Sequence, residues 1–179
     1  GFTTSVIDLT LDGPIVLLVC IWSTSKFPFF VSGASASYSY EQACKKAFQE
    51  AEFILSSSSI SNAKAISPSD VASPSDHGTL YLTQDSISML DWLLSSHTCS
   101  EIPQNTRSWE ELIERFNPSV VDLTRKNNLP YTLSVVQVVS TELFPMYFGY
   151  GFEPWSHKRR MTCGYSWKTE FPSFPHFFD

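Results

Sequence analysis

Glu50 is the side chain with the clearest chemical potential in this sequence. A helix is predicted over residues 41–55, and its period of 3.6 residues places on one face Ala43, Ala47, Glu50 and Ile54. A carboxylate among small apolar side chains needs a cation, a metal ion or several hydrogen-bond donors, because an unpartnered charge is costly away from water. Glu50 is therefore either a ligand at a site or a boundary glutamate that reaches solvent or an arginine.

The C-terminal segment 171–179 is a second candidate. It reads Phe-Pro-Ser-Phe-Pro-His-Phe-Phe-Asp, with four aromatic rings and two prolines in nine residues. Aromatic rings are costly to leave in water, and proline reduces the conformational freedom that is lost on docking. Such a tail either covers exposed core or is held in a groove, where the terminal carboxylate of Asp179 would stand at a defined point.

Two basic features have more than one interpretation. Residues 157–160 read His-Lys-Arg-Arg, which is either a phosphate-binding cluster or a solvated turn. His77 precedes a glycine and either faces a site or is a structural histidine.

Composition and charge exclude several classes of protein. A hydrophobic fraction of 42% and an aromatic fraction of 15% are typical of a folded chain. A net charge of -6 with only 12 basic residues argues against a nucleic-acid partner. The longest apolar run, residues 14–22, is too short to span a bilayer, so no membrane partner is expected. The 4 cysteines lie far apart, which favours reduced thiols and a cytoplasmic location.

The elements that would position these residues give an α/β (α+β) fold, with a mixed β-sheet and helices packed on it. Residues 14–22 are apolar on both faces, which predicts the central strand of a covered sheet, paired with a strand at 4–8 around a turn at 12–13. The other predicted elements are a small-residue loop at 33–37, a mobile Ser/Pro-rich loop at 56–75, a helix at 85–95, a helix at 108–116 begun by a capping box, and strands at 120–123 and 133–139.

Several of these segments resemble the YcaO superfamily. Gly33-Ala34-Ser35-Ala36, followed by Ala43-x-x-x-Ala47-Phe48-x-Glu50, is similar to the middle ATP-binding segment of that superfamily. Further similar stretches follow in the same order as in its azoline-forming cyclodehydratases, at residues 76–81, 109–139, 140–145 and 174–178. Together they cover nearly the whole chain.

The resemblance implies a YcaO-like ATP-binding fold and an enzyme that uses ATP and Mg²⁺ to activate backbone amides of a ribosomal precursor peptide. The products would be thiazoline or oxazoline rings, although thioamide or amidine formation stays open. Glu50 is the expected Mg²⁺ ligand, and Gln49 or Glu52 would replace a second family ligand, because Phe53 stands at its position. The resemblance further assigns phosphate contacts to Arg159 and Arg160, and catalytic roles in the tail to Pro175 and Asp179.

The resemblance also implies partners. The first ATP-binding glutamates of the superfamily lie upstream of the matched region, so the chain is expected to be the C-terminal part of a longer or split enzyme that needs a missing N-terminal segment. A protein that recognises the leader peptide, and a flavin dehydrogenase, would work with it. The competing hypothesis is a non-catalytic docking scaffold that presents the peptide to a partner enzyme.

Overall fold

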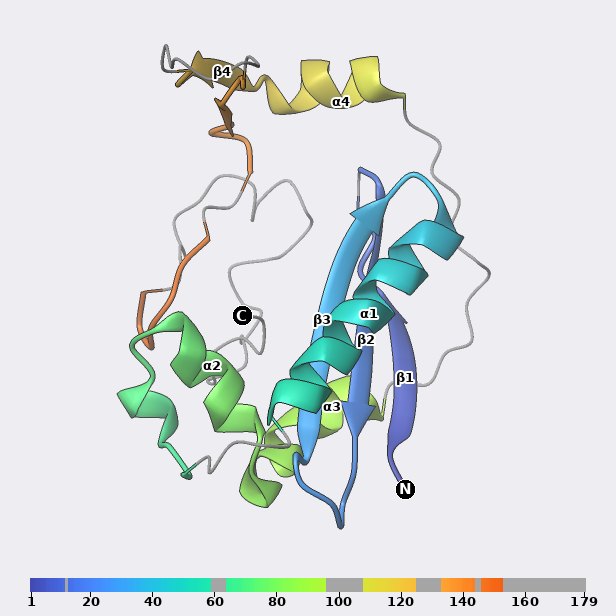
Figure 1. Cartoon of the computed structure of the whole chain (residues 1–179), viewed down its shortest axis with the longest axis vertical. Helices are drawn as coiled ribbons and strands as arrows, with labels where there is room; N and C mark the ends of the chain where they lie inside the picture. The colour runs from blue at the N-terminus through green and yellow to red at the C-terminus, as the bar shows by residue number, and fades with distance from the viewer. Residues whose placement is uncertain (12, 59–63, 96–107, 125–132, 144–145, 153–179) are drawn as a thin grey trace. The chain divides into compact units, whose positions relative to one another are not determined.

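A computed structural model describes residues 1–11, 13–58, 64–95, 108–124, 133–143 and 146–152. These residues form two compact units. Unit 1 contains the described residues up to 95 together with 147–152, and unit 2 contains the described residues from 108 to 146. Figure 1 shows the elements of both units.

The centre of unit 1 is a three-stranded antiparallel sheet in the order β1-β2-β3. Its strands are β1 (Thr3–Asp8), β2 (Ile15–Trp22) and β3 (Phe30–Ser37). The prediction of a strand that is central and covered on both faces is confirmed for β2, whose residues from Leu17 to Ile21 are 0 to 4% exposed. Apolar side chains on both faces need a covering layer on each side, and unit 1 supplies both.

The small-residue segment at 33–37 is a strand, so the prediction of a loop there is wrong. It forms most of β3 and pairs with β2, with Gly33 opposite Val19 and Ser35 opposite Leu17. Glycine and alanine have low intrinsic strand propensity. They are nevertheless favoured in a strand where a helix packs closely against the sheet, because larger side chains would not fit there.

The helix predicted at 41–55 is confirmed as α1 (Tyr40–Ser58), which lies across β2 and β3 (Figure 1). It covers one face of the sheet through Ala43, Ala47 and Ala51, all of them 0% exposed. The Ser56 hydroxyl donates to the Glu52 carbonyl at 2.8 Å, and the Ser57 hydroxyl donates to the Ile54 carbonyl at 3.0 Å. These bonds accompany the continuation of the helix into the serine-rich segment.

The loop predicted at 56–75 is therefore shorter than expected. Besides the end of α1, it contains η1 (Pro68–Asp70) and the start of α2 (Pro74–Tyr81). Proline is favoured in the first turn of a helix, where its missing N–H would have no partner. The two prolines that suggested a loop thus begin helical turns.

The second face of the sheet is covered by α2, η2 (Gln84–Leu90) and α3 (Asp91–Leu94). Leu80, Leu90 and Leu93 pack against Leu18 and Cys20 of β2. The helix predicted at 85–95 is thus a 3₁₀ segment followed by one α-helical turn. Residues 76–81, one of the stretches that are similar to the YcaO superfamily, lie within α2.

A capping box begins α2. The Asp76 carboxylate accepts hydrogen bonds from the Ser73 hydroxyl at 2.7 Å and from the Ser73 N–H at 2.9 Å. Together with the Ala72 N–H, these donors hold the pKa of Asp76 below its usual value, the Ser73 hydroxyl having the largest effect.

Cys20 gives a pH-dependent prediction, because burial raises the pKa of its thiol to about 12. The unfolded chain would ionise this thiol above pH 9.0 while the folded chain would not. The free energy of unfolding should therefore fall by about 1 kcal/mol between pH ~8 and pH ~10 relative to a Cys20→Ala variant. Urea titrations of both proteins at both pH values measure this difference, and parallel pH profiles would contradict it.

Unit 2 consists of one helix and one two-stranded ribbon. The predicted capping box at 108–111 is confirmed: the Ser108 hydroxyl accepts from the Glu111 N–H at 3.2 Å, and the Glu111 carboxylate accepts from the Ser108 N–H at 2.7 Å. It begins α4 (Trp109–Phe116). The strands predicted at 120–123 and 133–139 are confirmed as β4 (Ser119–Asp122), which begins one residue earlier, and the shorter β5 (Val136–Val139), and the two pair antiparallel.

The fold is thus a mixture of helices and small antiparallel sheets. The prediction of helices packed on a sheet is confirmed, but the prediction of a mixed sheet is wrong for the described residues, since every strand pair there is antiparallel. In the same part of the chain, no helix has both the length and the apolar character needed to cross a membrane.

Candidate functional site

Glu50 lies at the outer edge of β3, where its side chain is exposed. Its Oε2 atom accepts a hydrogen bond from the Ala34 N–H at 2.7 Å. This is the boundary position that the sequence left open as one of two alternatives, because α1 turns Ala47 and Ala51 toward the sheet and leaves Glu50 at the border of the buried stripe.

The Glu50–Ala34 bond protects an open sheet edge. Among the residues that the structure describes, β3 pairs only with β2, so its other edge presents backbone groups that another strand could pair with. The Glu50 carboxylate accepts a hydrogen bond from one of these groups, the Ala34 N–H. Of the alternatives left open by the sequence, the boundary position is the one observed, with a backbone amide as the partner.

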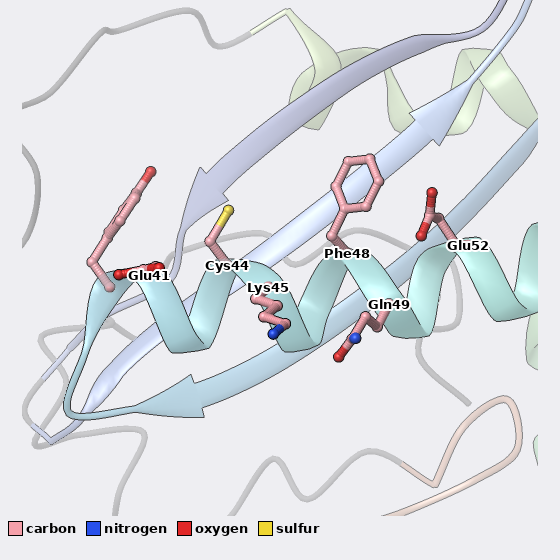
Figure 2. A pocket seen from close by; sticks show the side chains of 7 residues that line it. Glu41, Cys44, Lys45, Phe48, Gln49 and Glu52 are labelled. Atoms are coloured by element: carbon pink, nitrogen blue, oxygen red, sulfur yellow. The ribbon is translucent and has the colours of Figure 1, made fainter.

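Gln49 and Glu52 lie on a different flank of α1 from Glu50. Both line a surface hollow of about 550 Å³ along the helix, shown in Figure 2. The other residues lining it are Tyr40, Glu41, Cys44, Lys45 and Phe48. The structure thus brings Gln49 and Glu52 together but leaves Glu50 outside the hollow.

The expected Mg²⁺ site is not formed by the residues that the structure describes. Among them, no group of three His, Cys, Asp or Glu side chains is placed to hold a metal ion. Glu50 is engaged by a backbone amide, and the two side chains expected to replace the second ligand lie around the helix from it. The described donor set does not fit the ion.

The remaining predicted site residues fall outside the described part of the chain. They are Arg159 and Arg160, expected to contact phosphate, and Pro175 and Asp179, expected to act in the tail at 171–179.

His77 is a structural residue, which was one of its two predicted roles. It is 0% exposed, and its Nε2 accepts a hydrogen bond from the Gly149 N–H at 3.1 Å. Its ring meets the edge of Phe148 with a centroid distance of 5.7 Å. The Tyr150 N–H also donates to the Val71 carbonyl at 3.0 Å. Segment 147–152 is thus held against η1 and α2, a contact that sequence patterns give no signal for.

A second hollow, of about 260 Å³, was not anticipated from the sequence. It lies where β3, the end of α1 and α2 meet. Its hydroxyl-bearing residues are Ser32, Ser57, Ser58, Ser75, Thr79 and Tyr81, and Gly78 also lines it. The serine-rich composition of residues 56–75 was the available signal, but the sequence could not show that these hydroxyls lie beside β3.

No protein-family model, curated protein or solved structure matches the chain. The YcaO resemblance therefore stays a prediction. The two motifs that carry it most clearly have a packing role here: Gly33 and the Ala43-x-x-x-Ala47 spacing bring helix and strand together, and Glu50 bonds the strand edge.

Variants of Glu50 separate the edge role from a metal-ligand role. Glu50→Ala removes the acceptor and should lower the free energy of unfolding by about 1 kcal/mol, with faster hydrogen–deuterium exchange at the Ala34 amide. Glu50→Gln keeps an oxygen acceptor and should leave that amide protected. Exchange measured by NMR tests both, with Glu52→Ala as the control on the same helix. Unchanged exchange in Glu50→Ala would contradict the edge role.

Proposed function

We propose that the chain is a non-catalytic docking scaffold that presents an extended peptide to a partner enzyme. The observation that carries the proposal is the β4–β5 ribbon. All eight residues of its two strands are exposed, and five of them are valines: Val120, Val121, Val136, Val138 and Val139. Isolated two-stranded ribbons are marginally stable in water, so a third strand would stabilise this one.

The outer edge of β5 suits addition of a peptide strand. The Leu123 N–H donates to the Val135 carbonyl at 2.8 Å, which places the backbone groups of Val135 on the side facing β4. Because these groups alternate along an antiparallel strand, those of Val136 and Val138 are directed to the outer edge. A bound peptide would gain main-chain hydrogen bonds there and contact exposed valines on both faces.

The test uses a labelled peptide of alternating threonine and valine with a lysine at each end. Fluorescence anisotropy with the full chain should show saturable binding, with a Kd of about 100 μM. Val138→Pro removes the outward N–H and should weaken binding at least about tenfold, whereas Val138→Thr keeps the N–H and shape and should bind like wild type. Equal binding by both variants, or no binding to wild type, would overturn the proposal.

The second candidate function is an ATP-dependent cyclodehydratase component, as the YcaO resemblance implies. What supports it is the resemblance together with the exposed position of the Glu50 side chain, although the Ala34 N–H already bonds its Oε2 atom. Such an enzyme would need phosphate contacts from Arg159 and Arg160, catalytic groups from the tail, and the ATP-binding glutamates of a missing N-terminal segment. It would act with a leader-recognition protein and a flavin dehydrogenase on a precursor peptide.

Calorimetry with ATP and Mg²⁺ separates the two functions. The scaffold should show no Mg²⁺-dependent ATP binding, alone or with an added upstream segment. An enzyme component should bind at least in the combined sample, and Glu50→Gln should abolish that binding while the Ala34 amide stays protected. Mg²⁺-dependent ATP binding that is lost in the Glu50→Gln variant would contradict the scaffold proposal and support the enzyme component.

A further inference from the structure

The two faces of β1 differ in exposure. Ser5 and Ile7 are half-buried, and Ile7 packs against the cluster that contains Leu18 and Cys20. Thr4, Val6 and Asp8, on the other face, are exposed, with Val6 at 44%.

The same face is covered on the neighbouring strand. Thr4, Val6 and Asp8 stand opposite Ile21, Val19 and Leu17 of β2, which are 4%, 0% and 1% exposed. The cover over β2 and β3 is α1, which approaches closely at Gly33. A helix is about 10 Å wide and strands are about 4.8 Å apart, so one helix covers about two strands and leaves β1 bare.

The flank of α1 beside this bare face is amphipathic. Tyr40, Cys44 and Phe48 are half-buried at spacings of four residues, and Glu52 continues the row. Figure 2 shows Cys44, Phe48 and Glu52 projecting from the same side of α1, the side on which β1 runs. The hollow of about 550 Å³ lies along this flank.

Charge around this surface is mainly negative. Asp8, Glu41 and Glu52 are exposed carboxylates, and Lys45 is the only basic residue among the described ones that line the hollow. The chain as a whole carries -6, so two copies meeting here would bring like charges together. A partner with basic borders and an apolar centre would complement both the charge and the rings.

We propose that the α1–β1 surface, made by the exposed face of β1 and by Tyr40, Cys44, Phe48 and Glu52 of α1, docks an amphipathic helix of a partner protein. The helix would place leucine-like side chains against Phe48 and Val6, and lysines or arginines beside Glu52 and Asp8. The row from Tyr40 to Glu52 is about 18 Å long, which matches about three turns of a partner helix. This inference is independent of the β4–β5 ribbon.

The probe is a labelled peptide with two repeats of Leu-Lys-Lys-Leu-Leu-Lys-Leu, titrated with the full chain and followed by fluorescence anisotropy. We expect saturable binding with a Kd of about 10 μM. Val6→Lys and Glu52→Lys should each weaken it at least about tenfold, because each places a cation beside a basic helix. Glu114→Lys in α4 makes the same charge change in unit 2 and should bind as wild type.

Several outcomes would overturn the proposal. They are absence of binding at about 1 mM, equal weakening by Glu114→Lys, and equal affinity for a peptide with glutamate in place of every lysine. Sedimentation of the chain alone should show a monomer, and a dimer that Val6→Lys dissociates would assign the surface to a second copy. Urea unfolding of each variant verifies that a lost signal is not a lost fold.

Discussion

Gly33→Ala is expected to be the most destabilising single-methyl change in unit 1. A Cβ at this position would stand 2.3 Å from the Ala47 carbonyl oxygen and 2.5 Å from the Ala51 nitrogen. Both are backbone atoms of α1, so no side chain can turn aside, and the whole helix would have to move from the sheet. We expect a loss of about 3 kcal/mol or more in the free energy of unfolding, at the upper end for overpacked cores.

Gly1→Ala is the matched control, because nothing lies within 4 Å of a Cβ placed there. Urea unfolding followed by circular dichroism should give wild-type stability for the control and an early transition for Gly33→Ala. The shift should also release Glu50 from Ala34, so exchange of the Ala34 amide should accelerate. Wild-type stability in Gly33→Ala would show that α1 does not pack this close to β3.

His77→Phe is expected to release segment 147–152. Phenylalanine can still pack against Phe148 but cannot accept the hydrogen bond from the Gly149 N–H, which lies at a buried position. A buried amide without an acceptor costs about 1–3 kcal/mol, so unfolding should shift by that amount. The segment should also open locally, which limited chymotrypsin digestion at Phe148 and Tyr150 would detect.

His77→Gln is the control, since its amide oxygen can take the place of Nε2 as acceptor. It should lose less stability than His77→Phe and should keep the Gly149 amide protected. Gly149→Ala tests the other partner: its φ of 100° is strained for alanine, and its Cβ would stand 3.0 Å from the Phe152 ring. A His77→Phe protein with normal stability and normal digestion would contradict the role assigned to His77.

Local sequence signals predicted the elements that depend on near neighbours. The apolar run of β2, the period of α1 and the Ser108–Glu111 capping box each contain their information within a few consecutive residues. The hydrogen bonds of a helix and of its cap join residues three or four apart, so these elements can be inferred without knowing the fold.

The candidate site was predicted less well, because its geometry depends on which flank of α1 each side chain occupies. Glu50, Gln49 and Glu52 are almost adjacent in sequence, but the first meets β3 and the other two line the hollow. The helical period shows that these residues diverge, but it cannot show which neighbour each one meets.

The sequence by itself thus determined a folded chain with a buried central strand, a long helix with a small apolar face, and a capped helix followed by two strands. Only the tertiary structure decided that Gly33 belongs to a strand. It also decided that Glu50 accepts a hydrogen bond from a backbone amide 16 residues away, and that His77 accepts a hydrogen bond from a backbone amide 72 residues away. The physical reason is that close packing and satisfaction of buried donors are properties of surfaces brought together from distant parts of the chain.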